Sequence, residues 1–204
     1  MKAIRIALWA LVAVAALGLA WITTQDLLDP EARERAVGRA ADLGGPFTAT
    51  LAAADAAPRP ITQADLEGRP YAIFFGFTHC PDVCPTTLYE AGQWLEALGP
   101  DAGKVDVYFA SVDPARDTAE TMADYLRPFS DRIRAITGTP EEMEAMRRQW
   151  RVVAEKVPLE GGGYNVNHTA TTFLMDADGK FFGTIGYGES AEAAVAKLKR
   201  LADS

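Results

Sequence analysis

The sequence predicts a single α/β domain in which helices pack against a largely buried sheet. Short apolar runs alternate along the chain with segments that have the apolar spacing of helices, and this alternation is typical of α/β folds. Residues 71–77 are apolar throughout, as expected for a strand covered on both faces. A chain of 204 residues that is 49% hydrophobic and 24% charged can build one well-cored domain but is short for two.

The strands are recognised as short apolar runs that end at turn residues. They are expected at residues 47–51, 60–62, 71–77, 105–112, 133–137, 152–157, 171–175 and 180–185. A loop of small residues separates the first two, and the third leads straight into a segment with two cysteines. The last two flank Asp176-Ala177-Asp178-Gly179, whose composition predicts the turn of a β-hairpin.

The helices are recognised by apolar residues that recur at intervals of three and four. They are expected at residues 85–98, 118–129, 140–150 and 190–201, with a helical turn at 63–66. Gly99-Pro100 ends the first helix, Pro140 suits the first position of the third, and Ser190 is expected to cap the fourth. The elements therefore begin as strand, cysteine loop and helix, and continue to alternate.

An apolar segment at residues 6–22 precedes the domain and predicts export. Its length is short for a membrane-spanning helix and slightly long for a cleavable signal core, so both interpretations remain open and an uncleaved anchor is favoured. Lys2 and Arg5 before it place the N-terminus in the cytoplasm. We expect residues 1–25 to form a transmembrane helix in the inner (cytoplasmic) membrane, 26–45 a stalk, and 46–204 a globular domain on the periplasmic side.

The chain after Trp21 is strongly acidic. It holds all 28 acidic residues and, because Lys2 and Arg5 precede it, 18 of the 20 basic ones, which gives a net formal charge of −10. Such a charge argues against nucleic acid as a partner. It suits a basic protein partner or simple solubility, and indicates no function by itself.

Cys80 and Cys84 are the two cysteines of the chain, which is too few for a disulfide scaffold. They lie where a buried strand gives way to a helix, so their sulfurs can converge on one metal ion or on each other. With Pro85 at the first helical position, Cys84 is expected to be the N-cap, where free N–H groups and the helix dipole stabilise a thiolate. Thiolates are soft ligands that favour Cu(I) and zinc.

Three blocks of the sequence resemble the SCO/SenC family of copper proteins. They are Phe75-Gly76-Phe77-Thr78-His79-Cys80-Pro81-Asp82-Val83-Cys84-Pro85, Ser111-Val112-Asp113-Pro114-Ala115-Arg116-Asp117-Thr118 and Val166-Asn167-His168-Thr169. The blocks occur in the family's order, and the resemblance covers about residues 45–202. It implies a thioredoxin-like fold with a central mixed sheet flanked by helices, and copper bound as Cu(I) or Cu(II). It also implies a role in assembling the binuclear copper site of cytochrome c oxidase subunit II.

The resemblance assigns roles to single residues. Cys80, Cys84 and His168 match the family's copper ligands, and they form the one cluster of soft ligands in the sequence, so one copper ion per chain is expected. Asp113 matches an acidic residue that supports the site as a neighbour or as a weak extra ligand, and Asp82 is expected to help in the same way.

His168 is far from the cysteines in sequence, just before the strand at 171–175. A lone histidine is more often a hydrogen-bonded structural residue. In a thioredoxin-like sheet, however, the loop that leads into this strand packs against the cysteine loop, so the topology brings His168 to the sulfurs. Asn167 stands where many relatives have Asp, which removes one charge beside this ligand.

Three other residues resemble metal ligands but are not expected to be any. His79 is next to Cys80, yet neighbouring side chains point apart in an extended backbone, so it should be exposed or merely near the site. Met143 and Met146 have a spacing of three residues on a helix, which is ordinary core packing.

The same two sulfurs support two functions. The favoured one is a copper metallochaperone, a binding protein that passes its ion to oxidase subunit II. The alternative is a thiol-disulfide oxidoreductase that reduces the cysteines of that copper site, and peroxide reduction is a third and weaker possibility. Thioredoxin-type reductases have two residues between their cysteines and a cis-proline opposite, whereas this chain has three residues and Ala170 after His168-Thr169, which favours metal binding.

Export implies that the site works in an oxidising compartment, where the protein needs further partners. An oxidising compartment tends to close Cys80 and Cys84 into a disulfide that cannot take Cu(I). We therefore expect a thiol reductant as well as an upstream copper donor.

Overall fold

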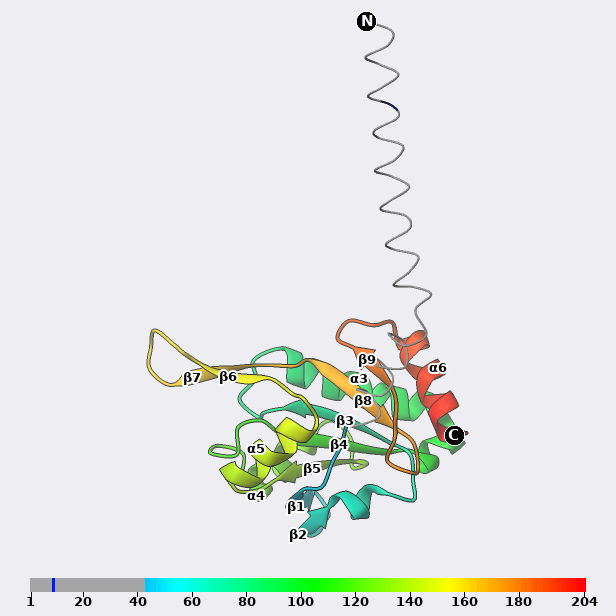
Figure 1. The fold of residues 1–204 in the computed structure, drawn as a ribbon, viewed down its shortest axis with the longest axis horizontal. Coiled ribbons are helices and arrows are strands. Elements are labelled where there is room, and N and C mark those ends of the chain that lie inside the picture. Colours follow the sequence, from blue (N-terminus) through cyan, green and yellow to red (C-terminus); the bar gives the residue numbers. More distant parts are fainter. Residues whose placement is uncertain (1–8, 10–42) are drawn as a thin grey trace, which may run out of the picture. The chain divides into compact units, whose positions relative to one another are not determined.

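The computed structural model of the chain describes Trp9 and residues 43–204 (Figure 1). The predicted membrane anchor at residues 1–25, Trp9 apart, and the stalk up to residue 42 lie outside the described residues. Among the helices that are described, none has both the length and the apolar character needed to cross a membrane.

A mixed seven-stranded sheet forms the centre of the described domain, with the strand order β2-β1-β5-β4-β3-β8-β9. Its strands are β1 (Thr48–Ala53), β2 (Ala56–Thr62), β3 (Tyr71–Gly76), β4 (Asp106–Ser111), β5 (Ile133–Thr137), β8 (Thr171–Met175) and β9 (Phe181–Gly186). β3, β4 and β5 run parallel, whereas β1 and β8 run antiparallel to their neighbours β5 and β3. The expected thioredoxin-like fold with a central mixed sheet is confirmed.

The helices flank this sheet. They are α3 (Val83–Leu98), α4 (Ala119–Leu126), α5 (Pro140–Gln149) and α6 (Ala191–Ala202), with two 3-10 helices, η1 (Gln63–Leu66) and η2 (Gly99–Lys104). Their predicted start signals are present: Pro140 is at the first turn of α5, and the Ala193 N–H donates to Ser190 Oγ at 3.3 Å to cap α6.

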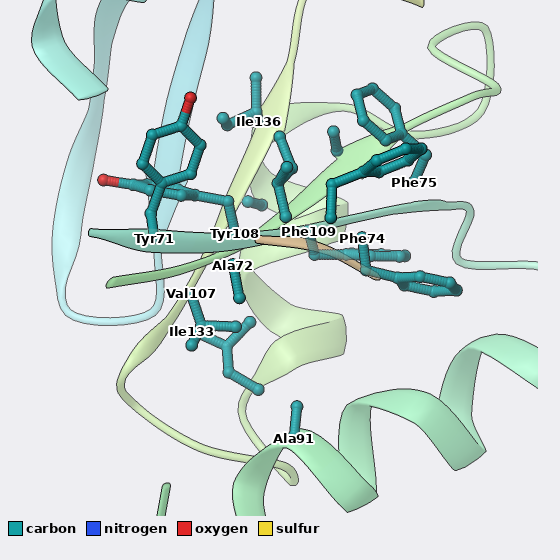
Figure 2. Packing of buried hydrophobic residues seen from close by; sticks show 14 of the residues in the cluster. Tyr71, Ala72, Phe74, Phe75, Ala91, Val107, Tyr108, Phe109, Ile133 and Ile136 are labelled. Carbon is teal, nitrogen blue, oxygen red and sulfur yellow. The ribbon is translucent and has the colours of Figure 1, made fainter. Parts of the chain in front are cut away.

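The core lies on both faces of the sheet, as the uninterrupted apolar run of β3 predicts. Every residue of β3 is buried. Ala72 points to the side where Ala91 of α3 lies, whereas Tyr71 points to the other side (Figure 2). There the Tyr71 ring contacts Trp150, the residue that follows α5. β3 is therefore held rigidly from both sides, and so is the point at which the cysteine segment leaves it.

Two segments that were expected to be loops are strands. The small residues between the first two strands form a tight hairpin in which Ala53 pairs with Ala56. Residues before Thr169 form β7 (Tyr164–His168), which pairs with β6 (Ala154–Pro158) in a separate two-stranded sheet. Figure 1 shows this β6–β7 hairpin extending away from the main sheet. The loop prediction was wrong for both segments because pairing with a neighbouring strand outweighs their weak intrinsic β-propensity.

Candidate metal centre

Cys80 and Cys84 lie between the end of β3 and the first turn of α3. The Cys80 N–H donates to the carbonyl of Phe77 at 3.3 Å, and the Cys84 N–H donates to Cys80 Sγ at 3.4 Å. Both cysteines are free thiols; Cys84 is buried and Cys80 is partly exposed. The sulfur of Cys80 is therefore accessible from solvent, as both metal binding and thiol chemistry require.

The predicted N-cap role of Cys84 is wrong. The N-cap of α3 is Asp82, and Cys84 is the second residue of the helix. Pro85 is then the third residue, which is still allowed because the first-turn N–H groups need no partner within the helix. The thiols nevertheless lie at the N-terminal end of α3, where free N–H groups favour negative charge.

His168 is the last residue of β7, and its ring faces the cysteines. Its Nε2 lies 3.4 Å from Cys84 Sγ, and its Nδ1 lies 3.1 Å from the carbonyl oxygen of Thr169. Since a carbonyl only accepts hydrogen bonds, Nδ1 carries the proton and Nε2 keeps a free lone pair. The rings of Phe74 and Phe77 meet the imidazole edge-on, with centroids 6.0 and 5.7 Å away.

The three predicted ligands come together in the structure. Within the part of the chain that is described, Cys80, Cys84 and His168 form the group whose ligand atoms could hold a metal ion, and those atoms all lie within 4.8 Å of one another. Bonds from a metal to thiolate and imidazole are about 2.0–2.3 Å long, so two ligands of one ion are at most about 4.6 Å apart. The ligand atoms therefore need to move only slightly closer together to bind one ion. Two thiolates with one imidazole suit copper in both of its oxidation states.

The two thiols have opposite acidities. The pKa of Cys80 is lowered to about 5, chiefly by a hydrogen bond from the Cys84 thiol, with help from the N–H groups of Asp82 and Cys84. The pKa of Cys84 is raised above its usual range by its hydrogen bond to Cys80 and by burial. The metal-free site therefore holds one thiolate and one thiol, and an ion bound by both sulfurs displaces the second proton.

A glycine makes room for the buried sulfur. A Cβ on Gly76 would lie 2.7 Å from Cys84 Sγ and 2.7 Å from a ring carbon of Phe109. Real Cβ atoms essentially never come so close to other atoms. Gly76 therefore lets Cys84 lie directly against the end of β3. Gly76 lies within the first of the three sequence blocks, but its steric role follows only from the packing.

A buried carboxylate fixes the loop that leads to Cys80. Asp117 accepts hydrogen bonds from the Thr78 hydroxyl at 2.6 Å, the Thr78 N–H at 3.2 Å and the Ser111 hydroxyl at 2.7 Å. Burial raises its pKa. Asp117 lies in the second sequence block, yet sequence reasoning gave it no role, because its partners are 39 and 6 residues away.

The two supporting acids of the sequence analysis lie in different surroundings. Asp113 is buried and bonded to Arg116 and to the Tyr164 hydroxyl, at 2.9 Å from the latter, so its carboxylate is not among the clustered ligand atoms. The side chain of Asp82 is exposed, while its N–H is directed at Cys80 Sγ.

The residues that were rejected as ligands stay outside the cluster. His79 is exposed, and its Nδ1 lies 3.0 Å from the hydroxyl oxygen of its neighbour Thr78. Met143 and Met146 are buried in the core, as their spacing predicts. Asn167 is exposed on β7.

An open groove of about 350 Å³ gives access to the centre. One wall is the cysteine loop from Cys80 to Val83, and the other is formed by residues 165–168 of β7 together with Ala170. Cys80 and His168 border this groove, whereas Cys84 is buried and is not part of its lining.

The chain is similar to known proteins over most of its length. A family model described as SCO1/SenC matches residues 35–203. The structure of ScoI from Bradyrhizobium japonicum with copper bound is 44% identical with a TM-score of 0.70, and the match covers 78% of this chain and 99% of that one. The structure of yeast Sco1 with copper bound is 32% identical with a TM-score of 0.70, covering 80% and 90% of the two chains.

The human mitochondrial SCO1 homolog is 37% identical to this chain over 157 residues. The match covers 76% of this chain and 50% of the human protein. Overall, the chain spans about half the length of the first mitochondrial relatives that it matches.

Proposed function

Because the chain belongs to the SCO1/SenC family, whose members bind copper and take part in the assembly of cytochrome c oxidase, we propose that it is a copper metallochaperone. It binds one Cu(I) or Cu(II) ion through Cys80, Cys84 and His168 and delivers the ion to the copper site of oxidase subunit II. The observation that carries this proposal is the meeting of two sulfurs and one imidazole nitrogen within 4.8 Å.

The unequal exposure of the ligands indicates how the ion leaves. Cys80 borders the open groove and is partly exposed, so a cysteine of the partner can replace it first. Its low pKa makes it a thiolate at neutral pH and a good leaving ligand. Cys84 is buried and stays bound to the ion until the partner has supplied a ligand. Transfer then proceeds by stepwise exchange of ligands.

A specific observation also favours the second candidate, a thiol-disulfide oxidoreductase. Cys80 is a partly exposed thiolate, and Cys84 is a buried thiol within reach of it. This is the arrangement of an attacking and a resolving cysteine. His168 separates the two candidates, because imidazole is a copper ligand and has no required part in disulfide exchange.

The cellular test asks what restores the oxidase when this protein is missing. The gene is deleted, and the copper content and activity of the terminal oxidase are measured with no addition, with added copper and with a membrane-impermeant thiol reductant; wild-type and Cys80→Ser protein serve as the positive and negative controls. A chaperone predicts that added copper rescues the deletion. A reductase predicts that the thiol reductant rescues it instead; this outcome overturns the chaperone.

We further propose that residues 1–25 anchor the protein in the inner membrane and that the domain faces the periplasm. The uninterrupted apolar segment and the basic residues before it support this placement. An upstream copper donor and a thiol reductant would then act in the same compartment. An anchored protein stays in the membrane fraction after a high-salt wash, whereas a soluble form that begins near Trp21 would show a cleaved signal.

A further inference from the structure

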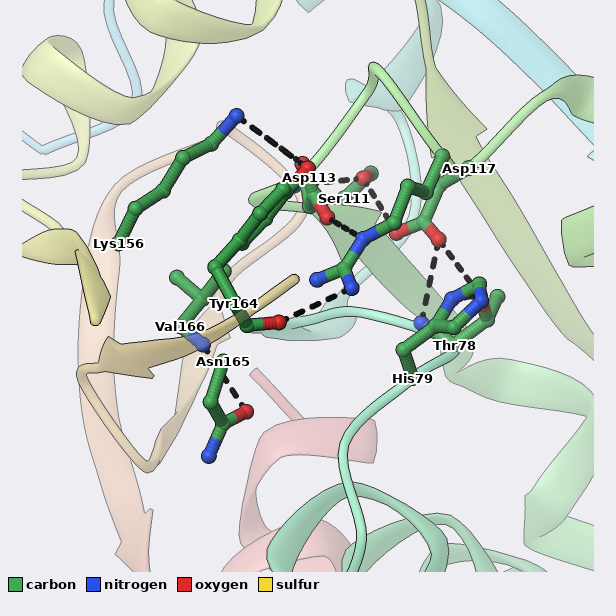
Figure 3. A network of polar contacts seen from close by, with 10 residues as sticks. Thr78, His79, Ser111, Asp113, Asp117, Lys156, Tyr164, Asn165 and Val166 are labelled. Atoms are coloured by element: carbon green, nitrogen blue, oxygen red, sulfur yellow. Dashed lines mark hydrogen bonds and ion pairs between the residues drawn. The ribbon is translucent and has the colours of Figure 1, made fainter. Parts of the chain in front are cut away.

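A cluster of four polar residues joins the β6–β7 hairpin to the body of the domain. We call Asp113, Arg116, Lys156 and Tyr164 the hairpin clasp. Asp113 and Arg116 follow β4, whereas Lys156 and Tyr164 belong to β6 and β7. Figure 3 shows Asp113 lying beside Tyr164, with Lys156 pointing toward it. The Tyr164 hydroxyl donates to Asp113 Oδ1 at 2.9 Å, and Lys156 Nζ lies 3.6 Å from the same oxygen.

Arg116 connects Asp113 to the start of β7. Its Nε donates to Asp113 Oδ2, and its Nη1 donates to the Tyr164 carbonyl at 3.1 Å. Its guanidinium carbon also lies 3.9 Å from the centre of the Tyr164 ring. Because Asp113 is buried, its carboxylate oxygens need hydrogen-bond partners within the protein. Arg116 therefore binds both the backbone and the side chain at the start of β7.

The same guanidinium reaches the surroundings of the metal centre. It lies 5.6 Å from the centre of the Phe77 ring, and that ring meets the His168 imidazole edge-on at 5.7 Å. Arg116 thus contacts Tyr164 at one end of β7, and through Phe77 it is connected to His168 at the other end. Both ends of the strand are tied to one side chain.

The hairpin depends on such contacts for its position. Neither β6 nor β7 belongs to the main sheet, and Val166 is the one buried residue among the ten residues of the two strands. An isolated two-stranded hairpin is marginally stable in water. Cys80 and Cys84 are fixed by β3 and α3, but His168 is only as well placed as the hairpin that carries it.

We propose that Arg116 is a positioning residue of the metal centre, which clamps the β6–β7 hairpin so that His168 stands within reach of both sulfurs before an ion binds. The inference rests on the proposed copper binding by Cys80, Cys84 and His168. Arg116 itself touches neither the ion nor its ligands. Since Cu(II) needs the nitrogen donor and Cu(I) is retained by two thiolates, displacement of His168 affects the two oxidation states differently.

The test compares Arg116→Lys with wild type in the full-length protein. Lysine keeps the charge beside Asp113 but loses the planar fork that reaches two partners and stacks on a ring. Arg132→Lys is the matched control, because Arg132 also donates to a distant backbone carbonyl, that of Ala102, at the opposite end of the parallel strands. Tyr164→Phe is a milder second variant, which keeps the ring under Arg116 but removes the hydrogen bonds of the hydroxyl with Asp113 and Lys156.

Two measurements are made on each variant. In the metal-free protein, the nuclear Overhauser effect between the Phe77 and His168 rings reports whether the hairpin is in place. In the loaded protein, affinities for Cu(I) and Cu(II) and the thiolate-to-Cu(II) absorption band report on the centre. We expect Arg116→Lys to lose the ring contact, to shift the band and to bind Cu(II) about 10- to 100-fold more weakly, with Cu(I) binding and the unfolding temperature unchanged. Tyr164→Phe should shift in the same direction by less.

Three outcomes overturn the inference. One is an unchanged ring contact and Cu(II) spectrum in Arg116→Lys. Another is an equal loss of Cu(I) and Cu(II) affinity together with a lower unfolding temperature, which indicates a merely structural ion pair. The third is an equal effect of Arg132→Lys. If the wild-type protein binds no copper, the proposed function fails, while the ring contact still decides whether Arg116 positions the hairpin.

Discussion

Replacing Gly76 with alanine tests whether the packing behind the buried sulfur is as tight as the structure shows. Gly76 does not have a positive φ, so the backbone alone would accept alanine, and a compatible glycine-to-alanine change stabilises a protein by about 0.4–1 kcal/mol. The new methyl group, however, lies 2.7 Å from both Cys84 Sγ and the Phe109 ring, about 0.7 Å short of the 3.4 Å at which ordinary contacts begin. The steric clash therefore outweighs the gain in backbone rigidity, and Gly76→Ala is expected to destabilise the protein.

The magnitude follows from how little room the neighbours have. Phe109 is fully buried and stacks on Phe74 at 6.0 Å, so the ring cannot move without disturbing the core. Overpacking of this kind costs about 1–3 kcal/mol, which lowers the melting temperature of a domain of this size by about 2–12 °C. Metal sites tolerate changes of only about 0.2 Å in ligand distance, so a sulfur that yields by 0.7 Å leaves the centre.

The assay measures thermal unfolding of the metal-free protein and its Cu(I) affinity by competition with a chelator. Gly183→Ala is the control, because Gly183 lies in β9 of the same sheet and a Cβ there meets no atom within 4 Å. We expect Gly76→Ala to be less stable and to bind copper at least about tenfold more weakly, and Gly183→Ala to match wild type. Normal stability and normal affinity in Gly76→Ala would refute the reasoning.

Three further predictions concern the ligands. Cys80→Ser and Cys84→Ser should each abolish tight Cu(I) binding, since one thiolate with one imidazole is a poor site for a soft ion; tight binding by either variant in a chelator competition would mean that the ligands are wrong. His168→Ala should lose or shift the visible thiolate-to-Cu(II) band yet still take up Cu(I) under reducing conditions, and an unchanged Cu(II) spectrum and affinity would contradict its role as a ligand. Because folding lowers the pKa of Cys80 from 9.0 to about 5, its thiolate stabilises the metal-free fold fully above pH 9 and loses that contribution as the pH falls toward 5. Its alkylation by iodoacetamide should therefore level off above about pH 6, while Cys84 stays slow, and a rate for Cys80 that keeps rising to pH 9 would exclude the lowered pKa.

The sequence was informative wherever local pattern and fold agree. The strands at 133–137 and 171–175 were predicted at the residues where they are found, because short apolar runs between turn signals leave little choice of boundary. The three clustered ligands were predicted too, but by different routes. The spacing of the cysteines is local, whereas His168 could be placed only through the expected topology of the sheet.

The remaining features depend on contacts between distant residues. β7 was expected to be a loop, since Asn165 and Asn167 have low β-propensity and its partner β6 stabilises it only after folding. Proline is common at the first helical position and allowed in the next ones, so Pro85 alone could not fix the start of α3. Arg116 stands in one of the sequence blocks, yet its partners are up to 48 residues away, and no local pattern indicates them.

X-ray absorption spectroscopy of the copper-loaded protein tests the central claim most directly. The measurement gives the number and type of atoms bound to copper, and metal analysis of the same sample gives the stoichiometry. We predict one copper per chain, bound by two sulfur atoms and, in the Cu(II) form, by an imidazole nitrogen that disappears in His168→Ala. A spectrum with fewer than two sulfur ligands, or a stoichiometry other than one, would contradict a centre built from Cys80, Cys84 and His168.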